Sequence, residues 1–428
     1  MAKIKFRRDT TANWATANSV LSQGEPGLDI TTNSLKVGDG STAWSNLEYI
    51  ANRIYPTPEI EYTGVFGGLP SYWRYTGSPS VYISSSNSDF RTESSNFYWL
   101  DEHFDDGNYD LSGLTTINFK NIGGVKGYFD ISSKTEVLLT SFNLGNIAVV
   151  DEWYSLGGFS NTLTTCNVSS LIDVGGTFEI YGNQFVNGPR MDYTNLDRVT
   201  GTFTIDYNYG SSDVYFANTV APTFPSLTHA QNGINIHNNR YTSWTDFSSL
   251  HTLDGSFQFY NNSNNDDELY DGPGLPVCTR IQNGYLNYFN NSYMQSISEF
   301  ADLARIDYTL NMYDNSDLAS FPSFPVLTYI GGSIVAYNNP YMTTLDTAFL
   351  PSILRIDGNV DFAGCGLNEA SIDAILVTLA SLDGSDGTTS YNSRIINLDM
   401  GTNAIPSGTG LAAKAVLELR SCTVNVNS

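Results

Sequence analysis

The chain has 428 residues, which is enough for two or three domains or for one solenoid with its ends. Apolar residues make up 41% of it, which excludes global disorder, and the abundance of Gly, Asn, Ser, Thr and Tyr indicates a β-rich protein with many turns. The formal net charge of −24 disfavours binding to nucleic acid and to anionic membranes.

Targeting and redox signals are sparse. The first residues lack the apolar core of a signal peptide, and no apolar stretch is long enough to cross a bilayer, so we expect synthesis in a cytoplasm and no membrane insertion. The four cysteines lie far apart and form no Cys-x-x-Cys pair, which predicts reduced, mostly buried thiols. They are Cys166, Cys278, Cys365 and Cys422.

The first fifty residues have the pattern of a small separate module. The expected elements are a strand at 3–7, a helical turn at 11–17 and short strands at 28–30 and 35–37. Trp44 and Leu47 supply apolar anchors. A unit of this size has little core of its own, so we expect partners or trimerisation to stabilise it.

Several spaced anchors in this segment match a known pattern in order. They are Arg7-Arg8-Asp9, Trp14, Asn18, Leu21, Gly24-Glu25-Pro26-Gly27, Lys36-Val37-Gly38-Asp39-Gly40 and Trp44-Ser45-Asn46-Leu47. With them, residues 1 to about 50 resemble the N-terminal module of many tail-fibre, tail-spike and tropism-determinant proteins of tailed bacteriophages. The resemblance implies a module that joins a virion fibre to the particle or to its trimer mates, and it implies no catalytic residues.

Residues 51–110 combine prolines with many aromatic residues. Pro56, Pro58, Pro70 and Pro79 suggest a linker or an irregular β segment, but the aromatic content is too high for a disordered one. We therefore expect an ordered, aromatic-rich connection, or the N-terminal cap of the domain that follows.

One thirteen-residue frame recurs about eight times between Leu171 and Cys365, at intervals of 23 to 31 residues. Its copies begin at Leu171, Leu196, Leu227, Leu250, Cys278, Leu303, Leu327 and Ile353. Positions 1, 4, 8 and 10 are apolar in most copies, and position 9 is mostly polar, as in a strand with one buried face. A repeat this short cannot bury its apolar face alone, so we expect the copies to stack into a β-solenoid over residues 111–366.

Position 13 of the frame is almost always Asn. Its residues are Asn183, Asn208, Asn239, Asn262, Asn290, Asn315 and Asn339. An Asn amide can bond backbone groups that a tight turn leaves unpaired, and Asn tolerates left-handed turn geometry. We therefore predict a structural asparagine ladder at one corner of the solenoid.

Position 11 is rich in Tyr and should face outward. Its tyrosines are Tyr181, Tyr260, Tyr288, Tyr313 and Tyr337, with Asp206 and His237 in two other copies. Stacked tyrosines could bind sugar rings or a protein partner, and they are the candidate binding residues. The alternative is a structural ladder that covers neighbouring strands, which we favour for any single Tyr.

The repeat resembles the receptor L-domain-like, leucine-rich-repeat-like pattern L-x-x-I-x-G-x-L-x-I-x-x-N over roughly residues 165–366. The resemblance implies a right-handed solenoid. The copy at Cys278 departs from the pattern, because Asn287 falls on an inward position and Leu286 on an outward one, which predicts a bulge there.

The spacing of apolar residues changes after residue 366. Ile372, Ile375, Leu376 and Leu379 predict a helix that ends near Asp383, and 395–398 predict a strand. A second helix is marked by Leu411, Ala412, Ala415, Val416 and Leu419, and 423–426 predict a last strand. Residues 367–428 should therefore form an α/β cap that closes the end of the solenoid.

We find no pattern that predicts catalysis, a metal centre or a cofactor. The four histidines, His103, His229, His237 and His251, share no column of the repeat. Two acidic stretches could bind Ca²⁺ through loop oxygens, although a solvated loop is the simpler interpretation. They are Asp101, Asp105, Asp106 and Asp110, and Asp266, Asp267, Glu268 and Asp271.

These observations predict a mainly β, non-enzymatic virion protein: a tail-fibre or tail-spike adhesin made in the host cytoplasm and located at the tail or particle surface. The expected partners are other virion proteins through residues 1–50, further copies in a homotrimer, and a host surface glycan or protein. Two alternatives stay open. One is a tail spike that degrades polysaccharide with paired carboxylates, and the other is a purely structural baseplate, collar or capsid-surface fibre.

Overall fold

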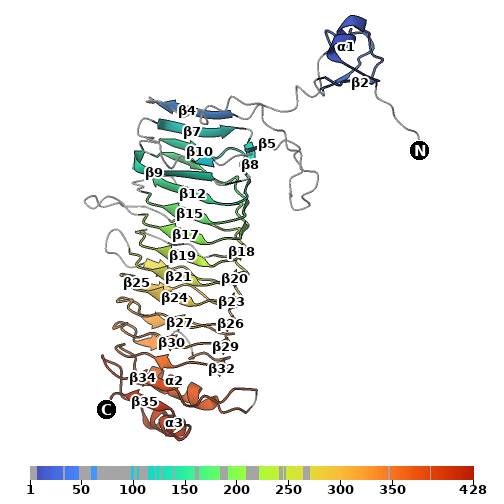
Figure 1. The fold of residues 1–428 in the computed structure, drawn as a ribbon. Coiled ribbons are helices and arrows are strands. Elements are labelled where there is room, and N and C mark those ends of the chain that lie inside the picture. The colour runs from blue at the N-terminus through green and yellow to red at the C-terminus, as the bar shows by residue number, and fades with distance from the viewer. Residues whose placement is uncertain are drawn as a thin grey trace.

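Figure 1 shows the computed structural model of the chain. The model describes residues 7–31, 34–47, 59–64, 98–100, 104–105, 114–120, 122–125, 127, 129–137, and 140–428 apart from 160–162, 184–190, 209–220, 241–243, 245–246, 264–269, 346–347 and 386. The fold is mainly β: a small N-terminal β unit, a parallel β-solenoid and two helices near the C-terminus (Figure 1). The fold class is thus confirmed, while the handedness and the L-domain-like detail stay predictions.

The N-terminal unit joins three short strands and one helix. They are β1 (Arg7–Asp9), α1 (Thr11–Ala17), β2 (Pro26–Asp29) and β3 (Ser34–Val37). β2 pairs in parallel with β1 and antiparallel with β3. The helix has the predicted bounds, and its N-cap Thr10 accepts a hydrogen bond from the Asn13 N–H. The strand predicted at 3–7 lies mostly outside the described residues, and β1 starts at its last position.

A thirteen-stranded sheet, here called the long sheet, runs the length of the solenoid. Its strands are β6 (Phe104–Asp105), β9 (Phe129–Val137), β12 (Tyr154–Phe159), β15 (Phe178–Tyr181), β17 (Phe203–Asp206), β19 (Ile234–His237), β21 (Phe257–Tyr260), β24 (Leu286–Phe289), β27 (Leu310–Asn311), β30 (Ile334–Val335), β33 (Val360–Asp361), β34 (Ile395–Leu398) and β35 (Thr423–Val426). Neighbours pair in parallel, and each coil contributes one strand.

An eleven-stranded parallel sheet, the second sheet, stacks alongside it. Its strands are β5 (Tyr98–Leu100), β8 (Ile122–Val125), β11 (Val149–Val150), β14 (Asp173–Val174), β16 (Arg198–Val199), β18 (His229–Ala230), β20 (Thr252–Asp254), β23 (Arg280–Gln282), β26 (Arg305–Ile306), β29 (Tyr329–Ile330) and β32 (Arg355–Ile356).

Shorter sheets complete the coils. They contain β4 (Glu59–Gly64), β7 (Leu114–Lys120), β10 (Ser141–Asn143) and β13 (Thr165–Asn167), then β22 (Tyr270–Gly272) with β25 (Met294–Ile297), and β28 (Ser320–Phe321) with β31 (Thr344–Leu345). Only β4 runs antiparallel to its neighbour here, against β7.

The core is a continuous column of apolar side chains inside the coils. The residues predicted at positions 1, 4, 8 and 10 are buried in it, as in Leu250, Leu253, Phe257 and Phe259 of one coil. Aromatic rings stack from coil to coil within it, for example Phe178 on Phe203 with centroids 4.8 Å apart. The period-2 alternation therefore separates inside from outside, as expected for a strand with one buried face.

The coil that starts at Cys278 is shifted by one residue relative to the predicted frame. Asn283 and Gly284 form a longer turn, so Leu286 pairs with Phe257 and points into the core, and Asn287 pairs with Gln258 on the outer face. The prediction that Leu286 faces outward and Asn287 inward is wrong. The strand itself contains no bulge, because the extra residue is accommodated in the turn before it.

Two helices and two strands form the C-terminal end. They are α2 (Glu369–Ser381), β34, α3 (Gly408–Leu419) and β35. Asn368 and Ser407 cap the two helices by accepting hydrogen bonds from the Ser371 and Thr409 N–H groups. β34 and β35 continue the long sheet in parallel, so the solenoid ends in α/β structure, with both strands at the predicted positions.

Candidate functional site

The outer face of the long sheet carries two columns of side chains, from positions 9 and 11 of the frame. In β15, β17, β19 and β21 buried and half-buried residues alternate strictly. The half-buried residues of successive coils are in register, so each column runs along the solenoid axis.

Five rings at position 11 form what we call the aromatic column. They are His237, Tyr260, Phe289, Tyr313 and Tyr337. Successive ring centroids lie 4.7, 4.7, 5.1 and 5.0 Å apart, and neighbouring ring planes are within 14° of parallel. The rings are thus stacked face to face at the spacing of the strands.

This stacking determines which parts of the rings a ligand could reach. Each inner ring has a neighbour on both faces, so only its edge and any hydroxyl group point outward. Tyr337 is different, because the next coil places Ala363 at this position and no ring follows. One face of Tyr337 therefore has no stacked ring among the described residues, and the rest of the aromatic column presents ring edges, which are polar except at Phe289.

Two of the predicted binding tyrosines lie outside the aromatic column. Tyr181 is separated from it by Asp206, whose Oδ1 lies 2.9 Å from His237 Nδ1, and its ring leans toward Gly157. Tyr288 is fully buried, and its hydroxyl donates a hydrogen bond to the Pro273 carbonyl oxygen at 2.5 Å. The outward placement of Tyr288 is therefore a wrong prediction, because the longer turn gives that position to Phe289.

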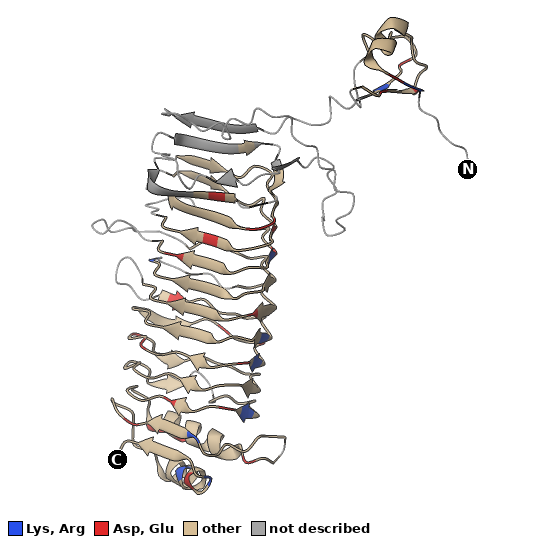
Figure 2. Ribbon diagram, viewed as in Figure 1, with Lys and Arg blue, Asp and Glu red and all other residues tan. Residues whose placement is uncertain are grey.

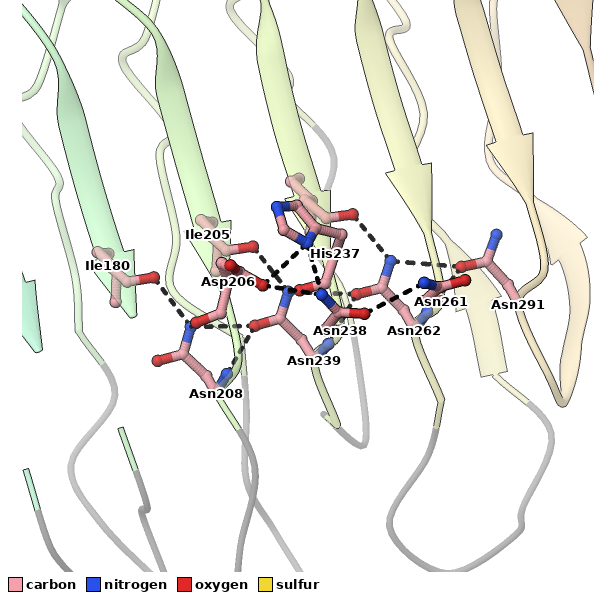
Figure 3. A network of polar contacts seen from close by, with 11 residues as sticks. Ile180, Ile205, Asp206, Asn208, His237, Asn238, Asn239, Asn261, Asn262 and Asn291 are labelled. Carbon is pink, nitrogen blue, oxygen red and sulfur yellow. Dashed lines mark hydrogen bonds and ion pairs between the residues drawn. The ribbon is translucent and has the colours of Figure 1, made fainter. Parts of the chain in front are cut away.

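The asparagine ladder lies at the corner directly after the long sheet (Figure 3). Its buried members are Asn183, Asn208, Asn239, Asn262, Asn291, Asn315 and Asn339. The Oδ1 of Asn239, for example, accepts the backbone N–H and the Nδ2 of Asn208 at 3.1 and 3.0 Å. The Nδ2 of Asn239 also donates to the Ile205 carbonyl at 2.8 Å. Each amide thus pairs backbone groups of the preceding coil that the turn leaves open.

The ladder residue of the shifted coil is Asn291, and the prediction of Asn290 is wrong. Asn290 lies one position earlier and has a φ of 55°. The same left-handed conformation occurs at Asn238, Asn261 and Asn338, with φ between 54° and 57°. Left-handed geometry therefore belongs to position 12, while position 13 supplies the buried amide.

A second set of amides borders the aromatic column. At position 12, Asn261 donates to Asn238 at 3.2 Å and Asn290 donates to Asn261 at 2.6 Å. At position 9, Asn311 donates to Asn287 at 2.7 Å. Half-buried Tyr edges flanked by amides form a surface that can exchange hydrogen bonds with hydroxyl groups of a ligand.

Carboxylates gather at the end of this face nearer the N-terminus. Burial raises the pKa of Glu179, and the neighbouring charges of Asp130 and Asp206 raise it further. No counter-charge from Lys or Arg is paired with Glu179 among the described residues. These carboxylates could bind a positively charged group of a ligand. Glu179, Asp130 and Asp206 do not form a cluster of the kind that holds a metal ion.

Arginines gather on the second sheet (Figure 2). Arg280 and Arg305 both bind Asp307, at 2.7 and 2.6 Å, and the Arg305 guanidinium lies 3.8 Å from the centroid of the Tyr329 ring. These side chains connect consecutive coils, and their charges are matched by aspartates. Because these charges are balanced, the second sheet is a weaker candidate for ligand recognition than the outer face of the long sheet.

The N-terminal unit owes its compactness to two stacked indole rings. Trp14 and Trp44 are 3.9 Å apart and within 9° of parallel, and Lys36 Nζ donates to the Trp44 carbonyl at 2.6 Å. A Cβ at Gly27 would lie 2.6 Å from the Trp44 ring, so only Gly fits there. The Asp39 carboxylate accepts hydrogen bonds from the Thr42 hydroxyl and from the Thr42 and Ser41 N–H groups after the turn, and these bonds lower its pKa.

Residues 4–42 match the family model of the major tropism determinant N-terminal domain. The matched segment includes Trp14, Gly27 and Asp39, whose roles in the unit are given above. The match supports a module of the phage tail-fibre type and covers a small part of the chain. No curated protein and no solved structure matches the chain in the other two comparisons.

Most of the acidic residues that the sequence suggested as calcium ligands are not tested by the structure. Asp101, Asp106, Asp110, Asp266, Asp267 and Glu268 lie outside the described residues, as does the side chain of Asp105. Elsewhere in the described ranges, no three His, Cys, Asp or Glu side chains gather as metal ligands would. In the same part of the chain, no helix has the length and apolar character needed to span a membrane.

Proposed function

We propose that this protein is a tail-fibre or tail-spike adhesin of a tailed phage, attached to the virion by residues 1–50. The match of residues 4–42 to the tropism-determinant module is the observation that carries this proposal. Other virion proteins are its partners at that end, and a homotrimer is its working form. Its location is the tail or the particle surface.

The outer face of the long sheet is the proposed recognition surface for a host glycan or protein. Tyr260, Phe289, Tyr313 and Tyr337 contribute ring edges and, at Tyr337, one ring face without a stacked ring, and the bordering amides contribute hydrogen bonds. Tyr181 lies farther along the same face and belongs to its acidic end. A sugar ring stacks on the face of an aromatic ring, which makes Tyr337 the strongest contact.

Binding of the purified protein to host cells tests this proposal. The wild-type chain should bind and should block adsorption of the phage. We expect Tyr337→Ala to weaken binding about tenfold, since a stacking contact contributes about 1 kcal/mol or more. Ala363→Tyr should weaken it as well, because the new ring would cover the free face.

Tyr341→Ala is the matched control, because Tyr341 is highly exposed and lies outside the aromatic column. Equal binding by the Tyr337 and Tyr341 variants would contradict the proposed surface. Absence of any binding to host cells would remove the receptor role and leave attachment to the particle. Release of shortened glycans from host polysaccharide would contradict the non-enzymatic role.

A further inference from the structure

One hydroxyl group on the outer face of the long sheet is fully buried and has no hydrogen-bond partner in the described part of the chain. It belongs to Ser155 of β12, which lies between the core residues Tyr154 and Leu156 and therefore points outward. A buried hydroxyl group without a partner destabilises a fold, and alanine in its place would avoid that cost. Packing of the sheet alone therefore does not explain why serine occupies this position.

Ser155 lies between two carboxyl groups. Parallel pairing sets it beside Asp130 of β9 on one side and beside Glu179 of β15 on the other. Figure 2 shows a red acidic segment on each of these two strands. The two strands are separated by two strand spacings, about 10 Å, with β12 between them. Carboxyl groups that reach toward each other across this distance leave room for one small group above the Ser155 hydroxyl group.

Negative charge concentrates around this hydroxyl group. Asp206, one strand beyond Glu179, adds a third carboxylate, and its own contact with His237, at 2.9 Å, lies on the side farther from Ser155. Burial and then the charges of Asp130 and Asp206 raise the pKa of Glu179. A cation bound beside Glu179 would reduce this repulsion, so the charge pattern fits a positively charged ligand group.

The arrangement of acceptors fits a primary ammonium group. A metal ion is not the expected occupant, because the described residues contain no cluster of three His, Cys, Asp or Glu side chains that could hold one. A primary ammonium group has three N–H donors and no acceptor. Ser155, Glu179 and Asp130 supply three acceptors in one row. A carboxylate accepts up to about four hydrogen bonds, so other contacts of Asp130 leave capacity for one more.

The depth of the site favours lysine over other amines. Ser155 is 0% exposed and Asp130 8%, so these acceptors lie below the surface. The Tyr181 ring leans over Gly157 beside them, where an added Cβ would lie 2.9 Å from Tyr181 Cε1. Lysine carries its ammonium group on a narrow chain of four methylene groups that can lie along an aromatic ring, whereas the amine of a sugar is attached directly to a bulky ring. Glu179 is half-buried, and its rotatable bonds allow it to move aside and then close on the ligand.

We propose that Ser155, Glu179 and Asp130 together bind the ammonium group of a lysine that a basic surface of a partner protein presents. The net charge of −24 attracts such a surface and orients it on approach. The inference rests on the proposed recognition role of this face, and it assigns the acidic end of the face to a protein partner rather than to a glycan.

Saturation-transfer NMR with Nα-acetyl-lysine amide tests the site on the purified full-length protein. The probe should bind with the strongest saturation at its ε-methylene protons, and its uncharged Nε-acetyl derivative should not bind. We expect Glu179→Gln to weaken binding about tenfold or more, because it removes a charge-assisted hydrogen bond. Glu369→Gln is the matched control, since it removes the same charge at an exposed position of α2.

Ser155→Ala separates a binding role from a structural one. Without the probe, the thermal midpoint of this variant should equal or exceed that of the wild-type protein, because the hydroxyl group that it removes is buried without a partner. Its affinity for the probe should fall about threefold to tenfold, as expected for the loss of one hydrogen bond. A lower midpoint with unchanged affinity would instead assign Ser155 to the fold.

Three further results would overturn the inference. The first is no saturation of the lysine probe by the wild-type protein at millimolar concentrations. The second is equal weakening by Glu179→Gln and Glu369→Gln, which would reduce binding to a general attraction by the net charge. The third is glucosamine that binds more tightly than the lysine probe and is lost in Glu179→Gln, which would assign the site to an amino sugar.

Adsorption to host cells distinguishes this inference from the adhesin proposal. Binding of the lysine probe by a protein that does not adsorb to host cells would keep the lysine site and remove the receptor role. Adsorption that depends on Tyr337, by a protein that does not bind the probe, would keep the receptor role and remove the lysine site.

Discussion

At the scale of single residues, one buried Asn amide per coil forms the hydrogen bonds that the backbone groups at the turn after the long sheet need. The Oδ1 of Asn291 accepts the backbone N–H of Asn262 at 3.0 Å, and its Nδ2 donates to the Phe259 carbonyl at 3.0 Å. Neither backbone group can reach water, because the ladder residues are buried. A buried polar group left unpaired costs roughly 1–3 kcal/mol, so the ladder is a stability requirement.

A pair of adjacent substitutions tests this role. We expect Asn291→Ala to lower the apparent free energy of unfolding by about 2–4 kcal/mol, because it leaves two buried backbone groups unpaired. Asn290→Gly should change it little, since Asn290 has a φ of 55° that Gly adopts readily. Denaturant unfolding followed by circular dichroism measures both. Equal losses in the two variants would contradict the separate roles of positions 12 and 13.

At the scale of elements, the turn between the second sheet and the long sheet controls which residues face inward. In the coil before the shifted one, Gly255 and Ser256 connect β20 to β21, whereas Asn283, Gly284 and Tyr285 connect β23 to β24. The extra residue exchanges inward and outward positions for the whole strand, because side chains alternate with a period of two. A register change of one residue thus moves Tyr288 from the surface to the core.

Only Gly fits at position 284 of the longer turn, since a Cβ there would overlap the Gly255 carbonyl group of the preceding coil. We expect Gly284→Ala to destabilise the protein by about 2 kcal/mol, as an overpacked site does. Gly408→Ala is the control, because a Cβ at this position meets nothing within 4 Å. Thermal unfolding should show a lower midpoint for the first variant only, and an unchanged midpoint for both would contradict this explanation.

This turn also shows how far the sequence alone could predict the structure. The apolar positions, the two C-terminal strands and the helix at Thr11 follow from local periodicity and capping, which do not depend on distant contacts. The shift at Cys278 changes spacing by one residue, and the pattern fits either a bulge or a longer turn. A stacked tyrosine ladder was among the expectations, but which rings stack depends on the register between coils, so the presence of Phe289 in place of Tyr288 could not be predicted.

At the scale of the whole molecule, unbalanced negative charge makes stability depend on pH in two opposite ways. Burial alone would raise the pKa of Asp307, but hydrogen bonds from Arg280, Asn283 and Arg305 lower it to about 2. A carboxyl group with a lowered pKa stabilises the fold above its usual value near 4, and this contribution is lost as the pH falls toward 2. Glu179 has a raised pKa, so its contribution is present at low pH and is lost as the pH rises.

We therefore expect the thermal midpoint to be highest at mildly acidic pH. It should rise from pH 7 to about pH 5 as carboxylate repulsion weakens. It should fall below pH 4, because the Asp307 carboxyl group is protonated in the unfolded chain there but stays ionised in the fold until the pH approaches 2. Asp307→Asn should cost about 1 kcal/mol at pH 7, a value reduced for the solvent exposure of both arginines, and should flatten the decline below pH 4. Asp302→Asn, at an exposed site, is the control. A decline of unchanged steepness in the Asp307 variant would contradict this assignment.

The spacing of the asparagine ladder shows that the number of residues in a coil can vary without changing the height that the coil adds. Successive ladder residues are 31 apart from Asn208 to Asn239 and 29 apart from Asn262 to Asn291, but 23 to 25 apart elsewhere. Most of the extra residues fall after the ladder asparagine and before the next coil begins, at Leu227 and Cys278. Each coil still adds one strand spacing, about 4.8 Å, whatever its length. Added residues at this corner therefore leave the height of the solenoid unchanged, and only whole coils change that height.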